Sequence, residues 1–472
     1  MNTYLPPGPE RLPLVGNLLQ FRRDQLAFVT GLQRSYGRAA TFYLANLPVV
    51  MFFRPEAVRA ILVEQARNFT NGEFVGELKG VLGEGLLTTD GDVHRRQRRM
   101  VQPAFHKRRV EGYAEVMVAH TQQMLDAWQP GATIDLAAAM QGLTLRIVAK
   151  ALFNVDLRAE QTDLGRAFTG VIENPVGHAW SLRGLPINLP ITPYGKHQRA
   201  LHALDQFVYT LISRRRAEGT DTGDVLSMLL AARDDETAGD SGAEDGASLS
   251  DREIRDQAMT LFAAGHETTS NALSWTFYLL ARHPRERARL VAELRDVLGG
   301  RAPTVDDLAR LPYLDQVVKE SMRLYPPAWT QGRRAIAPFE LEGYSLPAGQ
   351  IVMFSQWVIH RLPDLWGDPD AFRPERFAPE AEQRIPPYAY FPFGGGPRMC
   401  IGMPFANLEA RLLLATMLQR YVPNLEPGFP VVPQPRITLR LRHGLRMTLD
   451  PLERRASVGV GLAAHTLPAG RG

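Results

Sequence analysis

The stretch FPFGGGPRMCIG, residues 391–402, contains the one cysteine of the 472-residue chain. An amphipathic helix is predicted directly after it, over 403–421, so Cys400 precedes a helix N-terminus. Backbone N–H groups and the helix dipole at that end favour a thiolate over a thiol. The glycines let the backbone approach a flat cofactor closely, and Arg398 supplies a cation for a cofactor carboxylate. A lone cysteine is usually a small buried apolar residue, and these neighbours argue against that interpretation.

Five positions of this stretch match the haem-binding signature of the cytochrome P450 family, which the chain resembles from about residue 5 to residue 449; they are Phe393, Gly396, Arg398, Cys400 and Gly402. The resemblance implies a mainly α fold with a smaller β portion. It places haem b between a long central helix and the helix after the cysteine loop, with Cys400 as the axial ligand of the iron. A thiolate ligand pushes electron density onto iron and favours O–O cleavage, which a monooxygenase needs.

The longest helix that the sequence predicts runs from Ser250 to about Arg282. Ser250 and Glu253 form a capping-box pattern at its start. Mostly small side chains follow one stripe of this helix; they are Leu261, Ala264, Gly265, Thr268 and Ala272. Such a stripe fits the approach of something large and flat. It also fits a tight helix–helix contact in which the threonine bonds to its own turn.

The resemblance favours the first interpretation, because residues 264–269, AGHETT, resemble the oxygen-activation motif of the family. It implies that Ala264 and Gly265 line the haem. Gly265 costs about 1 kcal/mol relative to alanine and permits a local bend. Thr268 is assigned to oxygen activation and Glu267 to a proton relay, so these two are the catalytic candidates. His266 is expected to face away from the haem.

A basic segment, residues 94–109, carries seven Lys and Arg and no acid. Such a run is commonly a solvated face or a nucleic-acid patch. The resemblance divides it instead: His94 and Arg98 are expected to reach the haem propionates. Arg398 is expected there too, with Arg333 or Arg334 as a further contact. The remaining cations then face solvent, where they would attract an acidic electron donor.

Glu320 and Arg323 share one face of a helix predicted over 314–324. Alone, such a pair is usually a solvated surface pair. The resemblance joins them to Arg376 in the segment PERF, residues 374–377. It implies that the three side chains lock the core behind the haem.

The expected walls of the substrate pocket are largely apolar, which favours a hydrophobic substrate such as a fatty acid, a terpenoid or a steroid-like molecule. They comprise residues 78–87, 168–189, 261–264 and 328–330. The named candidates are Phe74, Phe168, Trp180, Leu261, Ala328 and Trp329.

Composition is that of a large globular protein, with 45% hydrophobic and 22% charged residues. The net charge of +4 is too mild to indicate nucleic-acid binding. A single cysteine excludes an intramolecular disulfide. No signal peptide and no run of roughly 18 apolar residues is found, so a cytoplasmic protein without integral membrane association is expected. We expect one domain over residues 1–453 and a disordered tail over 454–472.

Three functions are compatible with these motifs. The first is a monooxygenase that inserts one atom of O₂ into a C–H or C=C bond. The second is a haem-thiolate peroxygenase, isomerase or dehydratase, which usually departs from the acid–threonine pair kept here as Glu267 and Thr268. The third is a haem sensor or electron carrier, which needs no proton relay. No flavin or ferredoxin domain follows Leu449, so NAD(P)H electrons are expected through an acidic ferredoxin or flavodoxin with its reductase.

Overall fold

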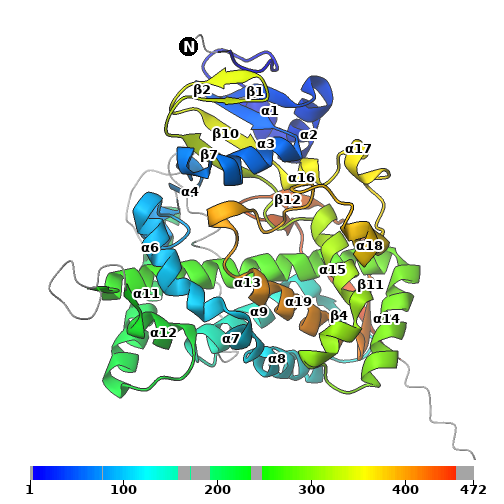
Figure 1. The fold of residues 1–472 in the computed structure, drawn as a ribbon. Helices are drawn as coiled ribbons and strands as arrows, with labels where there is room; N and C mark the ends of the chain where they lie inside the picture. Colours follow the sequence, from blue (N-terminus) through cyan, green and yellow to red (C-terminus); the bar gives the residue numbers. More distant parts are fainter. Residues whose placement is uncertain (1–3, 77, 158–170, 172–191, 235–246, 453–472) are drawn as a thin grey trace, which may run out of the picture.

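The computed structural model describes residues 4–76, 78–157, 171, 192–234 and 247–452. Helices make up most of this part of the chain, and the largest sheet lies on one side of them (Figure 1). The predicted fold class, mainly α with a smaller β portion, is confirmed. The helices are α1 (Leu18–Arg23), α2 (Gln25–Tyr36), α3 (Pro55–Arg59), α4 (Glu73–Gly76), α5 (Lys79–Leu82), α6 (Gly91–Val101), α7 (Lys107–Glu111), α8 (Ala114–Asp126), α9 (Leu136–Phe153), α11 (Pro193–Glu218), α12 (Val225–Ala231), α13 (Asp251–Arg282), α14 (Pro284–Leu298), α15 (Pro312–Leu324), α16 (Gln356–Ile359), α17 (Pro363–Trp366), α18 (Pro379–Glu382) and α19 (Met403–Leu418).

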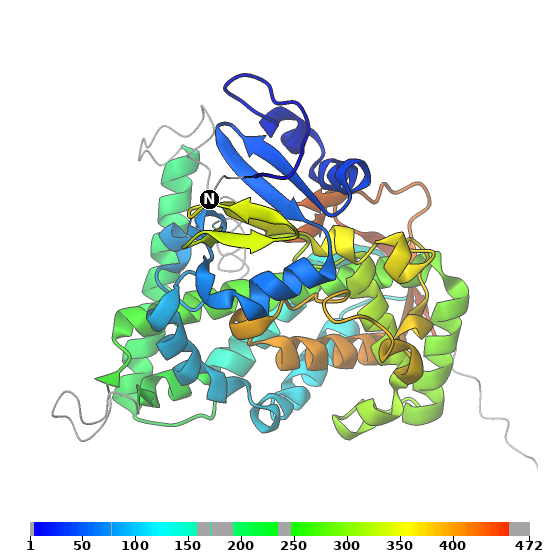
Figure 2. The same cartoon turned by 45° about the horizontal axis from the view of Figure 1, so that its top comes forward.

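The largest sheet has the strand order β1-β2-β10-β7-β3, and Figure 2 shows it with the top of the molecule turned forward. Its strands are β1 (Ala39–Leu44), β2 (Leu47–Phe52), β3 (Phe69–Thr70), β7 (Gln331–Ala335) and β10 (Ile351–Phe354). β2 pairs in parallel with β10, so the N-terminal hairpin is joined to a much later segment. This sheet therefore joins residues 39–52 to residues 331–335 and 351–354.

The strands near the C-terminus were not predicted from the sequence. β11 (Tyr421–Leu425) and β14 (Arg446–Pro451) pair with each other, and β14 also pairs with β4 (Thr133–Asp135). β12 (Pro433–Pro435) and β13 (Leu439–Leu441) form a hairpin. Two further pairs are β5 (Arg233–Asp234) with β6 (Ala247–Ser248), and β8 (Phe339–Leu341) with β9 (Tyr344–Leu346). The C-terminal strands are short and rich in proline, so alternation of apolar residues is too brief to reveal them.

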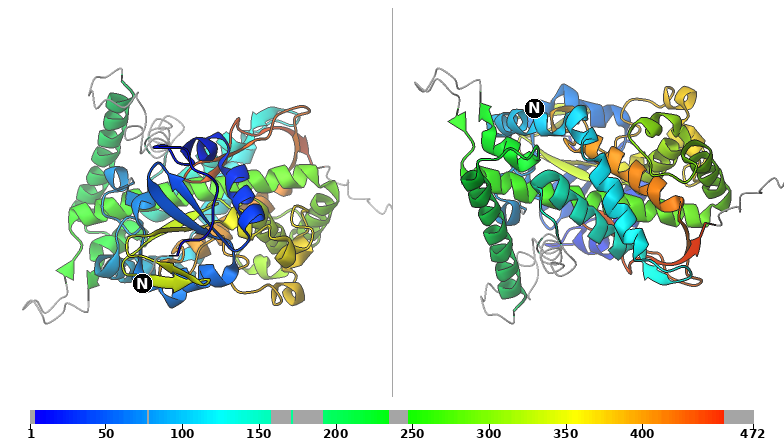
Figure 3. Two further views of the ribbon diagram at one scale, coloured as in Figure 1. Left: turned by 90° about the horizontal axis from the view of Figure 1, so that it is seen from above. Right: turned by 90° about the horizontal axis from the view of Figure 1, so that it is seen from below.

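Helix α13 spans the molecule and is surrounded by α9, α11, α15 and α19 (Figures 1 and 3). The predicted capping box is present: the Ser250 hydroxyl accepts from the Glu253 amide at 3.2 Å, and the Glu253 carboxylate accepts from the Ser250 amide at 2.8 Å. These bonds fix where the helix begins. Because α13 is enclosed on most sides, it forms a rigid platform for the residues in its middle.

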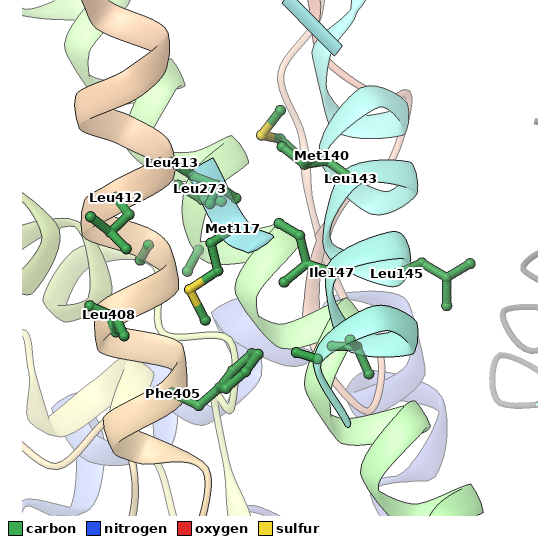
Figure 4. Close-up of a cluster of buried hydrophobic side chains, with 14 of the residues drawn as sticks. Met117, Met140, Leu143, Leu145, Ile147, Leu273, Phe405, Leu408, Leu412 and Leu413 are labelled. Carbon is green, nitrogen blue, oxygen red and sulfur yellow. The ribbon is translucent and has the colours of Figure 1, made fainter. Parts of the chain in front are cut away.

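Side chains of α8, α9, α13 and α19 form the main apolar core (Figure 4). Met117 lies between Phe405 and Leu408 of α19 and Ile147 of α9. Within the described residues, α9 alone is long and apolar enough to cross a membrane by length and composition, and 56% of it is buried inside the protein. That burial is typical of a core helix.

Candidate active site

Two glycines in the left-handed conformation shape the loop before Cys400. Gly394 and Gly396 have φ angles of 72° and 64°, which other residues rarely adopt. A Cβ on Gly396 would lie 1.8 Å from the carbonyl oxygen of Leu62, so that position accepts no side chain. The Cys400 amide donates to the Phe393 carbonyl oxygen at 3.0 Å and closes the turn. Gly396 is therefore required by the turn and by its packing against Leu62.

The Cys400 side chain is exposed at the N-terminal end of α19. Its sulfur nevertheless lies deep among protein atoms. This burial raises the pKa of the Cys400 thiol, whereas the N–H groups of Gly402 and Met403 and the charge of Arg98 lower it. The Arg98 guanidinium also donates to the Met399 carbonyl oxygen at 2.9 Å. A metal cation on the sulfur would remove the thiol proton, and these donors would then stabilise the thiolate.

The small-residue face of α13 is accessible in the middle of an otherwise buried helix. Ala264 is exposed and Thr268 is half-buried, whereas Glu267 and Thr269 are buried. The Thr268 hydroxyl donates to the carbonyl oxygen of Ala264 at 2.8 Å. Accessible surface on α13 and at Cys400, both within the core of the molecule, fits a flat group held between the two elements.

The structure explains why residue 265 has no side chain. A Cβ there would lie 2.9 Å from Cγ2 of Val148, so its bare side faces α9. The absence of a side chain is thus explained by close packing of two helices, which was the alternative interpretation of the stripe. α13 is also continuous from Asp251 to Arg282 in hydrogen bonding, so Gly265 interrupts nothing. Room on the cofactor side is provided by Ala264.

Basic side chains gather beside the cysteine loop around one carboxylate. His94, Arg333, Arg398 and Asp90 line a hollow of about 690 Å³. Arg398 pairs with Asp90 at 2.5 Å. The charge of Arg98 acts on both His94 and Arg398, so it belongs to the same group. Three arginines and one acid leave an excess of positive charge that favours an anionic ligand.

Arg333 shows most directly that this hollow suits an anion. It is buried, and its guanidinium donates to the Gly332 carbonyl oxygen at 2.7 Å and to the Gln331 side chain at 3.4 Å. Burial, followed by the charge of Arg398, lowers the pKa of Arg333 to about 10. The same two causes lower the pKa of His94 to about 4. The nearby acid Asp90 also acts on Arg333, but it is already paired with Arg398. Further carboxylates in the hollow would therefore stabilise this buried cation.

Arg334 points away from this hollow, because successive strand residues face opposite sides. Its guanidinium donates to the Gly349 carbonyl oxygen at 2.8 Å. The structure therefore brings Arg333, and not Arg334, to the other basic residues. The hollow, the accessible stripe and the exposed thiol together fit haem b, whose two propionates would meet the basic residues while its iron meets Cys400.

The Glu267 carboxylate is buried and is held by the C-terminal hairpin. Its Oε1 accepts from Nε of Arg440 at 2.7 Å and from the hydroxyl of Thr438. Neither partner could be recognised from the sequence, because nothing in the local pattern marks them. The neighbouring His266 directs its Nδ1 at the Phe262 carbonyl oxygen at 2.8 Å, and burial lowers its pKa.

The three residues predicted to lock the core lie together. Arg323 and Glu320 are fully buried and form a bidentate pair with N–O distances of 2.7 and 2.8 Å. Arg376 approaches the same carboxylate at 3.4 Å. Arg323 also donates to the carbonyl oxygens of His360 and Pro369. This group therefore ties α15 to the segment that leads to the cysteine loop.

The pocket candidates divide into several groups. Leu261 is buried and Ala328 is half-buried. Trp329 is a correction: it packs in the core of the large sheet, and its indole N–H donates to the Arg436 carbonyl oxygen at 2.8 Å. Phe168 and Trp180 lie outside the described residues, as does the side chain of Phe74. Beside Arg436 at the hairpin tip, Ile437 is 48% exposed, and sequence analysis did not single it out.

A family model described as Cytochrome P450 matches residues 6–440. The chain is 40% identical to a cyclooctatin synthase of Streptomyces melanosporofaciens over 94% of its length and 95% of that relative. It is 34% identical to a pentalenene oxygenase of Streptomyces avermitilis, covering 94% of this chain and 96% of that one. The structure of a retinoic acid-bound cyanobacterial CYP120A1 is similar, with a TM-score of 0.84, 30% identity and coverage of 96% and 100% of the two chains.

Proposed function

Because the chain belongs to the cytochrome P450 family and is a P450 monooxygenase, we propose that it uses O₂ to oxidise a terpenoid-like hydrophobic substrate. Enzymes of this family carry haem b and receive NAD(P)H-derived electrons through partner proteins. The observation that carries the proposal is the accessible Thr268 hydroxyl on α13, beside the buried Glu267. Relatives that oxidise terpenoids support this substrate class over fatty acids and steroids.

The side chains of this chain supply four functions around the cofactor. Cys400 supplies the thiolate ligand, while Arg333 and Arg398 would bind the propionates. The bound haem supplies the chemistry of O₂ activation. Thr268 can hold a water on the accessible face of α13: its hydroxyl proton is donated to the Ala264 carbonyl oxygen, and its oxygen can accept from that water. Apolar walls such as Leu261 exclude water from the substrate, which limits unproductive loss of protons and electrons.

Product analysis tests this function directly. A panel of terpenes, fatty acids and steroids is first scored by the spin-state shift of the ferric haem. Compounds that bind are then incubated in separate NADPH-driven and peroxide-driven reactions. Oxygenated terpenoid products in the NADPH-driven reaction are expected; products only with peroxide would indicate a peroxygenase. Thr268→Ala should keep haem and substrate binding but divert electrons to peroxide, and unchanged coupling would remove Thr268 from the mechanism.

We also propose that an acidic ferredoxin or flavodoxin docks beside the cysteine loop. Arg98 in α6 contacts this loop, and α7 follows in the chain with the exposed Arg108 and Arg109, which form no ion pair within the described residues. Arg96 was expected on the same open surface, but it pairs with Glu253 at 2.7 Å. Exposed charges steer a partner of opposite sign, and salt screens them over about 10 Å at roughly 0.1 M.

Stopped-flow reduction with such a donor tests the docking surface. Charge reversal of Arg108 and Arg109 should slow electron transfer and weaken its dependence on salt, while substrate affinity stays unchanged. A matched reversal of the exposed Arg442, which lies on the C-terminal hairpin, serves as the control. Reduction rates that change neither with salt nor with the double reversal would contradict the proposal.

We also propose that residues 1–453 form a single domain and that the protein is cytoplasmic.

A further inference from the structure

The C-terminal hairpin is anchored to the middle of α13. The indole N–H of Trp275 donates to the Leu439 carbonyl oxygen at 3.0 Å. The Asn271 amide donates to the Thr438 hydroxyl at 3.0 Å. Thr438 in turn donates to Glu267, so its oxygen is a donor and an acceptor at once. These bonds fix the hairpin beside the α13 turn that carries Glu267.

The ion pair between Arg440 and Glu267 is shielded from solvent. Nε and the second terminal nitrogen of Arg440 lie 2.7 Å from the same oxygen, Oε1. The Arg440 side chain is 12% exposed and that of Glu267 is 5% exposed. A charged pair at this depth interacts strongly, and removal of one partner leaves the other as an uncompensated buried charge.

The orientation of the Glu267 carboxylate, which is bound through Oε1, bears on proton transfer. Glu267 and Thr268 are consecutive on α13, and side chains at such positions do not face each other. The carboxylate is directed to the hairpin, whereas the Thr268 hydroxyl bonds along its own helix to Ala264. A carboxyl group bound to a guanidinium and a hydroxyl through one oxygen keeps a defined orientation.

We propose that Arg440 and Thr438 are positioning residues that hold the Glu267 carboxylate on the hairpin and so control its delivery of protons toward Thr268. This inference rests on the proposed role of Glu267 in the proton relay. It assigns a part in that relay to the C-terminal hairpin, a segment whose sequence carries no such signal. A further titratable neighbour is His266, whose pKa is lowered mainly by burial, while the charge of Glu267 raises it and that of Arg440 lowers it.

Difference infrared spectroscopy of the carboxylic C=O stretch tests, without any turnover, whether Arg440 and Thr438 hold the Glu267 carboxylate. In the haem-loaded protein at neutral pH, Arg440→Gln should produce a new band of a protonated buried carboxyl. The double variant with Glu267→Gln should lose that band, which assigns it to Glu267. Arg440→Lys should largely restore the anion. Arg442→Gln, an exposed change on the same hairpin, should leave the spectrum unchanged.

Coupling of NADPH use to product provides the second measurement. Arg440→Gln and Thr438→Val should change this coupling and its pH profile by roughly 2- to 30-fold, the range expected for residues that act through another group. Absence of the new band in Arg440→Gln, or coupling equal to wild type in both variants, would overturn the proposal. If Arg440→Gln does not fold, Thr438→Val alone decides, because it keeps the ion pair and removes one donor. An absence of oxygenated product in wild type would instead refute the proposed function and leave the infrared result intact.

Discussion

Replacement of Gly265 by alanine measures how closely α13 packs on α9. The new Cβ would lie 2.9 Å from Cγ2 and 3.4 Å from Cγ1 of Val148, a β-branched side chain with no exposed surface. Alanine is about 1 kcal/mol more favourable than glycine in a helix interior. Overpacking of a well-packed core costs roughly 1–3 kcal/mol. Gly265→Ala should therefore change the free energy of unfolding by between zero and about 2 kcal/mol, in the destabilising direction.

A double-mutant cycle with Val148→Ala separates the two contributions. Truncation of Val148 removes both clashing methyl groups, so Gly265→Ala in that background should be stabilising by up to about 1 kcal/mol. The coupling free energy between the two sites should then reach roughly 1–3 kcal/mol. Unfolding in urea, followed by far-UV circular dichroism and by haem absorbance, measures it. Gly142→Ala is the matched control, because Gly142 lies inside α9 with nothing within 4 Å of its added Cβ; this change should stabilise the protein.

Two outcomes would refute the reasoning. Additivity of Gly265→Ala and Val148→Ala within about 0.5 kcal/mol would show that Val148 is not the reason for the glycine. Loss of haem binding by Gly265→Ala with unchanged stability would instead support the original expectation that Gly265 makes room for the cofactor.

Three further predictions concern the cofactor and a buried acid. Cys400→Ser should abolish the strongly red-shifted Soret band of the reduced, CO-bound protein, and retention of that band would disprove thiolate ligation. Arg333→Gln should accelerate loss of haem to an acceptor protein because it removes a buried cation, whereas Arg334→Gln should not; equal rates for both would contradict the assignment. Burial raises the pKa of Glu409 to about 8 from 4.5, so the folded protein binds a proton there that the unfolded chain has lost at intermediate pH. The stability due to this group falls as pH rises from about 4.5 to about 8. Glu409→Gln should thus be more stable than wild type at the alkaline end and equal to it at the acidic end, as measured by thermal unfolding across this range; a difference independent of pH would exclude this titration.

The sequence alone predicted those parts of the molecule that local patterns determine. The cysteine loop could be found because its turn demands glycine at position 396. The start of α13 could be found because Ser250 and Glu253 satisfy each other within one turn. Both features depend on residues within a few positions, so they need no knowledge of the fold.

Features that depend on distant contacts could not be predicted in this way. Trp329 and Gly265 are examples, because an apolar or small residue fits either a pocket or a core, and only the neighbour decides which. Trp329 meets the large sheet, and Gly265 meets α9. The Glu267 carboxylate is bound by Arg440, which lies far along the chain in a strand too short to recognise. Each of these contacts joins elements whose relative placement is set by the whole core.

Helix geometry could have divided the basic run over 94–109 into two faces from the sequence alone. His94 and Arg98 are four residues apart and share the face of α6 that meets the hollow and the cysteine loop. Arg96 lies on a different face and pairs with Glu253, the same residue that completes the capping box of α13. Charge reversal at Arg96 would therefore disturb the start of α13 as well as any docking surface. A docking experiment gives a clear answer only with cations such as Arg108, which are exposed and form no ion pair within the described residues.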